Sequence, residues 1–415
     1  MKQFIYRIKR IYHFFTTALL QGFPALIKYS FPANRLKIIA ITGTDGKTTS
    51  STLVYQILKQ AGKKVGLIST VAAFIGDEAL DTGFHVTNPE PADLQKYLKQ
   101  MVTKKMEYVV LEFTSHGAYQ HRLAGIKPML AGLTNISHEH FDYQLNIENY
   151  IEAKAQFLRK SPVVVLNRDD MSFSKVKKYL AKGTKLLSYS QEDELPTVIK
   201  SAINHRFPEQ YNRMNARLAV AITTQLEIAP ADIAQGIANF TGVPGRMQWI
   251  PNKRGIQVVV DFAHTPEALT QALTSLRAKV QSGIKGAKLI AVFGCAGLRD
   301  ASKRPMMGKA GVELADLVVF TAEDPRTEDI WVIIRQMKEQ LTSGHEKINT
   351  VIDRSLAIDF AINRLAKKGD IVGIFGKGPE KSMCYGHTEY PWSDQGAVLR
   401  ALNREPPQQI NYNQS

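Results

Sequence analysis

The chain has 415 residues, which is long for a single hydrophobic core and predicts two or three domains. Hydrophobic residues make up 44% and charged residues 22%, as is typical of a folded globular protein rather than a disordered one. The net charge of +15 favours anionic partners, but no block of five like charges occurs, so nucleic-acid binding is not predicted. The two cysteines, Cys295 and Cys384, are too few for a disulfide framework or zinc cluster and indicate the cytoplasm.

Residues 1–36 predict an amphipathic helix with a basic start. Its apolar residues recur at helical spacing: Phe4, Ile8, Ile11, Phe15 and Leu19. Gln21, Gly22 and Pro24 interrupt the apolar run, so neither a signal peptide nor a membrane-spanning helix is predicted. Two interpretations remain. The favoured one has the helix packed on the first domain, and the other has residues 1–29 on a membrane surface.

Alternating apolar runs and helical patterns then predict an α/β domain with a mainly parallel sheet at residues 37–243. The expected strands are 37–42, 65–69, 108–113, 130–135 and 163–167, and the expected helices include 50–60, 92–103 and 148–159. Glycine and proline cluster at 240–255 and place a domain boundary near Val243. A second α/β series follows at 244–405, with strands at 257–262, 288–293, 317–321 and 370–375, and the polar tail 406–415 is expected to fray.

The stretch after the first expected strand predicts a phosphate-binding loop. Its residues are Gly43, Thr44, Asp45, Gly46, Lys47, Thr48 and Thr49. Backbone N–H groups at a helix N-terminus bind anions, Lys47 would reach the outer phosphates, and the Thr48 hydroxyl would ligate Mg²⁺. The longer pattern G-x-x-x-x-G-K-[ST] would need a glycine where Ile41 stands. The alternative is a plain strand–helix turn with an exposed lysine.

Glu112 ends an apolar strand, at the edge where open α/β sheets bind ligands. Its carboxylate is equally suited to capping the next turn and to coordinating Mg²⁺. The residues that follow it are polar and indicate a recognition surface: Thr114, Ser115, His116, Gln120, His121 and Arg122.

Asn135, His138, His140 and Asp142 follow the next strand. They could bind zinc, but the spacing differs from H-E-x-x-H, and a lone histidine here would usually be a hydrogen-bonded structural residue. Lys154 lies in the next expected helix and, taken alone, would be a solvated lysine. In the second domain, Arg299, Lys303 and Arg304 follow a glycine-rich turn and suggest a second anion site.

The combination of "GTDGKTT", "SHGAYQHR", "TNISHEHFDY", "GVPGRMQ", "DFAHTPEAL", "DASKRPMMG" and "GKGPE" resembles the Mur ligases of bacterial cell-wall synthesis. Within that family the resemblance is closest to the tripeptide synthetases, the MurE type. The family's short loop, G-T-[ND]-G-K-T-[TS], accounts for Ile41. The resemblance runs from about Lys37 to Leu402 and implies a central P-loop-type ATPase domain and a C-terminal Rossmann-like domain. The family's N-terminal UDP-binding domain is expected to be largely missing.

The resemblance implies the site residues in four groups. The ATP site would comprise Gly43, Thr44, Asp45, Gly46, Lys47, Thr48, Thr49, Asn167, Arg246, Asp261, His264, Lys303 and Arg304. The catalytic residues would be Lys47, Glu112, His140 and Lys154. The Mg²⁺ ligands would be Thr48, Glu112, His140 and Lys154, the last as an N-carbamylated lysine. The muropeptide would contact Thr87, Thr114, Ser115, Gln120 and Arg122, and the incoming amino acid Asp324, Pro325, Arg326, Gly376 and Glu380.

The implied reaction is ATP- and Mg²⁺-dependent addition of a diamino acid to UDP-N-acetylmuramoyl-L-Ala-D-Glu through an acyl phosphate, by a cytoplasmic monomer. Three motifs depart from the family's pattern: "TTP" at Asn88, "DNPR" at Glu323-Asp324, and "GKGHE" at Pro379. The Arg326 fork favours meso-diaminopimelate, whereas the added charge of Asp324 favours L-lysine. We expect meso-diaminopimelate by a narrow margin.

Two other functions are compatible with these residues. One is a related Mur-type or folylpolyglutamate-like amide ligase with a different acceptor. The other is a non-catalytic ATP-binding protein at the membrane surface, which the joint presence of the loop, Glu112 and Lys154 disfavours.

Overall fold

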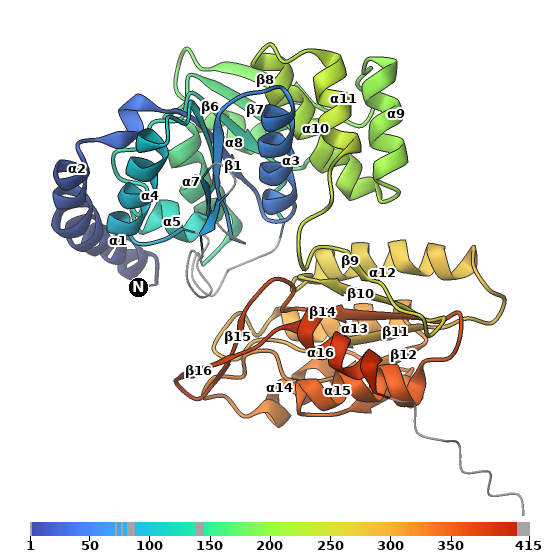
Figure 1. The fold of residues 1–415 in the computed structure, drawn as a ribbon. Helices are drawn as coiled ribbons and strands as arrows, with labels where there is room; N and C mark the ends of the chain where they lie inside the picture. The colour runs from blue at the N-terminus through green and yellow to red at the C-terminus, as the bar shows by residue number, and fades with distance from the viewer. Residues whose placement is uncertain (1, 71–72, 76–77, 81–87, 138–144, 405–415) are drawn as a thin grey trace, which may run out of the picture. The chain divides into compact units, whose positions relative to one another are not determined.

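The computed structural model describes residues 2–70, 73–75, 78–80, 88–137 and 145–404. The chain forms two compact units, Met1–Thr241 and Gly242–Ser415, so the observed division lies close to the boundary predicted near Val243 (Figure 1). The expected site residues Thr87 and His140 and the tail 406–415 lie outside the described residues. Among the helices of the described part, none is both long enough and apolar enough to cross a bilayer.

Unit 1 is built on an eight-stranded sheet with the order β4-β3-β2-β5-β1-β6-β7-β8. Its strands are β1 (Lys37–Thr42), β2 (Val65–Ile68), β3 (Ala73–Ile75), β4 (Glu78–Leu80), β5 (Tyr108–Glu112), β6 (Leu130–Leu133), β7 (Val163–Asn167) and β8 (Lys185–Tyr189). All pairs are parallel except those made by β3 and β4. The predicted mainly parallel α/β fold is therefore confirmed. The central strands read as continuous apolar runs because helices bury both of their faces.

Helices cover the two faces of this sheet (Figure 1). The helices after β1 are α3 (Lys47–Gln60), α4 (Pro91–Thr103), α5 (Ser115–Tyr119), α7 (Ile147–Leu158), α8 (Phe173–Lys178), α9 (Thr197–Arg206), α10 (Gln210–Gln225) and α11 (Pro230–Ala238). Apolar side chains of α4 and α7 share one core with β1, β5 and β6. Helix α10 lies on the opposite face, where Leu218 and Ile222 leave room for no side chain at Gly132 of β6. The layers leave the carboxyl ends of β5, β1, β6 and β7 side by side.

A helical run precedes β1 and packs on unit 1. It comprises α1 (Lys2–His13), the π-helical η1 (Phe14–Gly22), α2 (Phe23–Tyr29) and the short η2 (Pro32–Arg35). Helices η1 and α2 contact α4, and the Tyr119 hydroxyl donates a hydrogen bond of 2.5 Å to the backbone oxygen of Tyr6. The favoured interpretation, a helix packed on the first domain, is confirmed.

Unit 2 has a six-stranded sheet with the order β13-β12-β11-β14-β10-β9, in which β9 alone is antiparallel. The strands are β9 (Gln248–Ile250), β10 (Gln257–Asp261), β11 (Leu289–Phe293), β12 (Leu317–Phe320), β13 (Ile348–Thr350) and β14 (Ile371–Phe375). One face packs against α12 (Pro266–Gln281), α13 (Lys303–Leu314) and α14 (Ile330–Lys338). The other packs against α15 (Arg354–Phe360), η4 (Ala361–Leu365) and α16 (Asp394–Asn403). The turn η3 (His345–Lys347) precedes β13, and a hairpin of β15 (Ser382–Tyr385) and β16 (Thr388–Pro391) follows β14.

Candidate active site

The glycines of the phosphate loop are required by close packing as well as by backbone conformation. Gly46 has a φ of 78°, in the left-handed region that favours glycine. A Cβ on Gly43 would lie 1.7 Å from Thr134 Oγ1, and a Cβ on Gly46 would lie 2.0 Å from Asn215 Oδ1. The loop is therefore pressed against neighbouring polar side chains, with helix α3 beginning directly at Lys47. A helix N-terminus reached through such a turn is suited to binding phosphate.

Lys47 lies over its own loop. Its Nζ donates a hydrogen bond of 2.5 Å to the backbone oxygen of Thr44. This contact uses one of the three N–H groups of the ammonium. The other two remain able to donate hydrogen bonds to a bound phosphate.

Glu112 lies beside the loop, completely buried at the end of β5. Its Oε1 accepts hydrogen bonds from the Thr48 hydroxyl at 3.0 Å and the Thr70 hydroxyl at 2.9 Å. The Thr70 backbone N–H donates to Oε2 at 3.2 Å. The turn after β5 is capped by Thr114 instead, so the alternative of Glu112 as a capping residue is wrong. Sequence reasoning missed Thr70, because it follows β2 without any recognisable motif.

Lys154 on α7 is buried, with 1% of its surface exposed, so its interpretation as a solvated lysine is wrong. Its Nζ donates to the backbone oxygen of Gly43 at 2.6 Å and lies 4.5 Å from the centre of the Tyr150 ring. The Tyr150 hydroxyl is 3.2 Å from Thr44 Oγ1. Helix α7 thus places two side chains, Lys154 and Tyr150, in contact with the phosphate loop.

Asparagine side chains hold the loop from the neighbouring strands and from α10. Asn135 Oδ1 accepts a hydrogen bond from the Asp45 N–H at 2.9 Å. Asn167 Nδ2 donates to the backbone oxygen of Thr134 at 3.3 Å. The Thr134 hydroxyl in turn donates to the backbone oxygen of Asp45 at 2.6 Å. Asn215 contacts Gly46 from α10. Asn215 was missed, although two asparagines three residues apart on one helix, Asn212 and Asn215, are a readable signal.

The expected muropeptide residues gather around Asn88, which is buried. Asn88 Nδ2 donates to the backbone oxygen of Glu112 at 2.9 Å, and its Oδ1 accepts from the Thr114 N–H at 2.9 Å. Arg122 donates to Asn88 O at 3.0 Å and to Gln120 Oε1 at 2.9 Å. Asn88 therefore ties this loop to the strand that carries Glu112. From the sequence, Asn88 was predicted only to depart from a motif, with no structural role.

In unit 2, the expected nucleotide residues converge at the end of β10. Asp261 accepts hydrogen bonds from the backbone N–H groups of Met247 at 2.7 Å and Ala263 at 2.8 Å. Burial raises the pKa of Asp261, while Arg246 and these N–H groups oppose the rise. The Arg246 guanidinium lies 4.3 Å from the centre of the Phe262 ring. Lys303 Nζ donates at 2.6 Å to the backbone oxygen of His264.

Arg304 differs from its neighbours in this group. It is 1% exposed and forms a two-pronged ion pair with Glu328, at 2.6 and 2.8 Å. It also donates to the Ala296 backbone oxygen at 3.0 Å. Its charge is thus neutralised inside unit 2, which favours a structural role for Arg304 over contact with the nucleotide.

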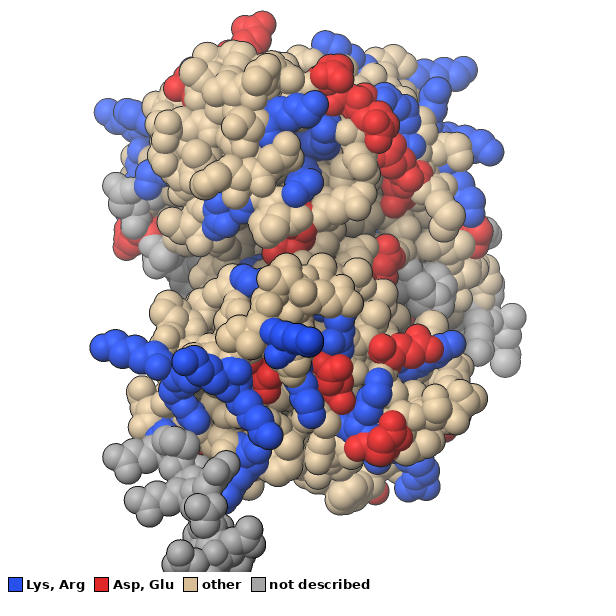
Figure 2. Space-filling model, turned by 90° about the vertical axis from the view of Figure 1, so that its right-hand side faces the viewer, with Lys and Arg blue, Asp and Glu red and all other residues tan. Residues whose placement is uncertain are grey.

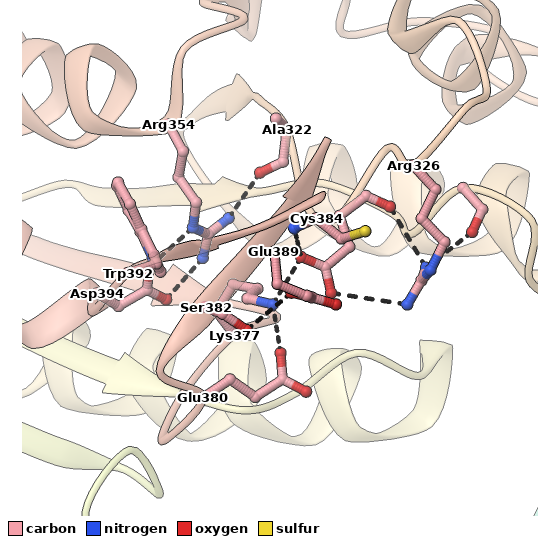
Figure 3. A network of polar contacts seen from close by, with 12 residues as sticks. Ala322, Arg326, Arg354, Lys377, Glu380, Ser382, Cys384, Glu389, Trp392 and Asp394 are labelled. Carbon is pink, nitrogen blue, oxygen red and sulfur yellow. Dashed lines mark hydrogen bonds and ion pairs between the residues drawn. The ribbon is translucent and has the colours of Figure 1, made fainter. Parts of the chain in front are cut away.

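The expected amino-acid pocket is a network of buried charges (Figure 3). Lys377 Nζ is fully buried and lies 2.8 Å from Asp324 Oδ1 and 2.5 Å from Glu380 Oε2. Burial lowers the pKa of Lys377, but Glu380 and Asp324 together outweigh it, and the net change is upward. Lys377 therefore remains a cation that holds both carboxylates. The sequence analysis gave it no role.

Arg326 lies at the edge of this network, with 21% of its side chain exposed. Its Nη1 donates to the backbone oxygen of Gly297 at 2.8 Å, and its Nη2 is 3.7 Å from Asp324 Oδ2. Asp324 and Arg326 have φ values of 42° and 54°, which are strained for residues with side chains. Such strain concentrates at ligand-binding sites.

A buried ion pair supports the same segment from behind. Arg354 donates to both carboxylate oxygens of Asp394 at 2.7 Å and to the Phe375 backbone oxygen at 2.8 Å. The Trp392 indole N–H donates to Asp394 at 2.8 Å (Figure 3). Arg354, itself held by Asp394, thus fixes the end of β14 at Phe375, directly before Gly376 of the expected pocket.

Glu323 is buried beside Asp324, and burial raises its pKa from 4.5 to about 7, against the opposing influence of Lys303 and His264. The folded protein thus keeps this proton to a higher pH than the unfolded chain. Relative to a Glu323→Gln variant, wild-type stability should fall by on the order of 2 kcal/mol between about pH 5 and about pH 8. Urea unfolding of both proteins at several pH values measures this difference.

The matched control is Glu339→Gln, which changes an exposed carboxyl of the same unit. That variant should follow the wild-type stability profile throughout. A Glu323→Gln variant that also follows it would show that Glu323 titrates normally.

The donor set at the loop suits Mg²⁺. The Glu112 carboxylate and the Thr48 hydroxyl supply oxygen ligands, and Mg²⁺ is usually bound by one or two carboxylates together with substrate phosphates and water. Within the described residues, no three His, Cys, Asp or Glu side chains are grouped so that they could hold a metal ion by themselves. The other expected ligand, His140, lies outside that part of the chain.

Two family models match the chain: the Mur ligase middle domain at residues 41–227 and the Mur ligase glutamate ligase domain at residues 245–378. The chain is 36% identical over 373 residues to UDP-N-acetylmuramoyl-L-alanyl-D-glutamate–2,6-diaminopimelate ligase of Clostridium botulinum. The aligned region covers 85% of this chain and 75% of that enzyme. It is 33% identical over 405 residues to the enzyme of that name from Geobacillus thermodenitrificans, over 91% and 81% of the two chains.

Solved structures show the same relationship. A structure of an enzyme of that name superposes with a TM-score of 0.54 at 29% identity, over 88% of this chain and 78% of the other. Folylpolyglutamate synthase of Mycobacterium tuberculosis superposes with a TM-score of 0.66 at 17% identity, over 92% and 94% of the chains, and so shares the fold. The phosphate loop, the α/β architecture of both units and these matches lead to one conclusion: the chain belongs to the Mur ligase family of enzymes.

Proposed function

We propose that this ligase adds meso-diaminopimelate to UDP-N-acetylmuramoyl-L-Ala-D-Glu in peptidoglycan synthesis, with conversion of ATP to ADP and phosphate. The observation that carries the proposal is the cluster at the carboxyl ends of β1 and β5, where Glu112 meets Thr48 and Lys154 meets Gly43. A simple nucleotide-binding turn has no need of a buried lysine and a buried carboxylate. The two relatives at 33% and 36% identity carry this activity in their names.

The loop and Lys47 would hold the phosphates of ATP, through the N–H groups at the start of α3 and the ammonium charge. Mg²⁺, when bound at Glu112 and Thr48, would supply electrostatic stabilisation of the transferring phosphoryl group. Transfer of that group to a substrate carboxylate gives an acyl phosphate, and attack by the amine of the amino acid gives the amide and releases phosphate. The loop of Thr114, Gln120 and Arg122 would orient the acceptor.

The net charge of +15 fits two anionic substrates. Figure 2 shows lysine and arginine side chains scattered over the visible face of each unit, with aspartate and glutamate side chains among them. This distribution suits general attraction of small anions better than a long nucleic acid. ATP and a nucleotide-linked precursor indicate the cytoplasm, and one chain carries all the proposed site residues, so a monomer suffices.

We further propose that Lys154 is N-carbamylated in the active enzyme. The side chain is buried with its Nζ beside the loop, and a carbamate forms when the neutral amine of a lysine reacts with CO₂ and releases a proton. The product is an anion beside the phosphate loop, where a second Mg²⁺ would balance its charge.

The choice of amino acid follows from the charges around Arg326. The charge of Asp324 was the argument for L-lysine, and Glu380 is the second carboxylate of the expected pocket. Both lie against Lys377 Nζ, at 2.8 and 2.5 Å, which reduces their attraction for lysine. Arg326 keeps donors that the backbone does not use, and its planar fork suits the second carboxylate of diaminopimelate.

Replacing Arg326 by alanine should lower kcat/KM for meso-diaminopimelate by roughly tenfold to a hundredfold, as expected for one lost charge-assisted contact. Lysine, which lacks the second carboxylate, should be a poorer substrate of the wild type and should lose much less. Steady-state kinetics with both amino acids measures this. Arg326→Lys is the control that keeps the charge without the fork and should recover only part of the loss. A wild type that prefers lysine, or an Arg326→Ala enzyme with unchanged kinetics, would rule out this assignment.

A further inference from the structure

The helical run at the N-terminus turns its apolar residues outward. Nine large apolar side chains of α1, η1 and α2 are exposed in the described part of the chain, and all of them except Phe14 follow one another at helical spacing along one side. We call these eight the N-terminal stripe: Ile8, Ile11, Tyr12, Phe15, Leu19, Leu20, Phe23 and Ile27. Leu20 is 73% and Tyr12 is 62% exposed. Isolated exposed apolar residues are common, but a continuous row of them marks an interaction surface.

The face of this run that packs on unit 1 combines polar side chains with two buried apolar ones, Ala25 and Leu26. Gln3 exchanges hydrogen bonds of 3.0 Å with Asn149, and Arg10 pairs with Glu152 and Gln156 of α7. Thr17 and Gly22 are buried farther along, where a Cβ on Gly22 would lie 3.1 Å from Ala124 Cβ. An ordinary amphipathic helix on a globular protein carries polar residues, not a row of apolar ones, on its outer face. These contacts hold the run in place, so the stripe stays directed away from unit 1.

The charge of this region is entirely positive. The first 44 residues contain no aspartate or glutamate and seven cations: Lys2, Arg7, Lys9, Arg10, Lys28, Arg35 and Lys37. Lys9 and Lys28 are exposed within the same run as the stripe. Apolar side chains next to exposed cations such as Lys9 and Lys28 match a bilayer with anionic headgroups, which offers hydrocarbon to the first and negative charge to the second.

A second copy of the chain fits this surface less well. A two-fold symmetric contact brings the same patch of each copy together, so Lys9 and Lys28 beside one stripe would lie near the same lysines of the other copy. The absence of acidic residues from the segment leaves nothing in it to offset that repulsion.

We propose that the segment Lys2–Tyr29 lies flat on an anionic phospholipid bilayer, with the N-terminal stripe in the headgroup–acyl boundary and Lys9 and Lys28 at the headgroups. The segment also packs on the loop of the candidate site, because the Tyr6 and Tyr119 rings are 4.6 Å apart and the Phe14 and His121 rings are 5.5 Å apart. Membrane binding would therefore hold the loop of Gln120 and Arg122 close to the lipid surface.

Vesicle sedimentation of the full chain tests this proposal. The probes are vesicles of phosphatidylcholine with phosphatidylglycerol, and vesicles of phosphatidylcholine alone. We expect binding to the anionic vesicles that weakens with added salt, and much weaker binding to the neutral ones. A stripe variant, Phe15→Gln, Leu19→Gln and Phe23→Gln, should bind the anionic vesicles at least about tenfold less, because three large apolar side chains are lost from the contact. Lys9→Gln with Lys28→Gln should reduce binding by a smaller factor.

The control variant changes three equally exposed apolar side chains of unit 2: Ile284→Gln, Trp331→Gln and Leu356→Gln. It should bind vesicles like the wild type. Circular dichroism and ATP turnover without vesicles should be unchanged in the stripe variant, since none of its residues belongs to the candidate site. Absence of wild-type binding to anionic vesicles would overturn the proposal, as would undiminished binding by the stripe variant. Self-association that depends on the stripe, without vesicle binding, would assign the surface to a second copy instead.

Discussion

A Lys47→Ala enzyme should lose ATP turnover by at least about a hundredfold while keeping its fold, because one electrostatic contact to the transferring phosphoryl group is removed. The structure explains both parts of this expectation. Within the described part of the chain, Lys47 Nζ donates its hydrogen bond to the loop's own backbone oxygen of Thr44, so its removal breaks no hydrogen bond between elements. Phosphate release in the presence of both substrates measures the loss.

Lys63→Ala is the matched control, since Lys63 is an exposed lysine just beyond the other end of α3. It should turn over ATP at the wild-type rate. Thermal unfolding should be similar for both variants and the wild type. Near-native phosphate release by Lys47→Ala would contradict the assignment of the loop to ATP.

The second large effect is expected at Lys154. Lys154→Ala should be nearly inactive, because it removes both the hydrogen bond of 2.6 Å to Gly43 O and the proposed carbamate. A high concentration of a short carboxylic acid, such as formate or acetate, should restore part of the activity by placing a carboxylate in the space left by the side chain. A structural role for Lys154 would not produce this rescue.

Two further measurements separate carbamylation from packing. Lys154→Met fills the same space without an amine and should be as inactive as Lys154→Ala, but with less rescue because the space stays filled. Incubation of the wild type with ¹³C-labelled bicarbonate should give a carbamate signal in the NMR spectrum that Lys154→Met lacks. Full activity of the alanine variant would exclude a catalytic role, and loss of activity with neither rescue nor a carbamate signal would leave only a structural one.

The predicted fold agrees with the structure where both faces of a strand are buried. Strands β1, β5 and β7 are apolar runs bounded by glycine or polar residues, and their predicted ends fall within one residue of the observed ones. Several of the strands that were not predicted have little hydrophobic pattern: β3 and β4 have three residues each, and β16 is exposed throughout. Pairing with a neighbouring strand, rather than local sequence, makes such segments extended.

The candidate site was predictable where motifs follow strands, because parallel strands bring their carboxyl ends together. Glu112 and Thr48 are 64 residues apart in sequence and share a hydrogen bond of 3.0 Å, as that rule predicts. Contacts that depend on tertiary packing were not predictable. Sequence alone could not show that Lys377 holds Asp324 and Glu380, or that Arg304 pairs with Glu328.

The N-terminal run shows a related limit. Spacing predicted its amphipathic helix, but the preference for packing apolar residues inward would have placed Ile8, Phe15 and Leu19 against unit 1. They are exposed instead, because polar contacts such as those of Gln3 and Arg10 hold the other face.

The most direct test of the central claim is product formation by the purified chain. The protein is incubated with ATP, Mg²⁺ and UDP-N-acetylmuramoyl-L-Ala-D-Glu, with one amino acid at a time, and phosphate release and product mass are followed together. The account predicts phosphate release that requires both the muropeptide and the amino acid, and an amide product with meso-diaminopimelate. ATP hydrolysis that is indifferent to the amino acid, or no amide product with any amino acid tested, would contradict it.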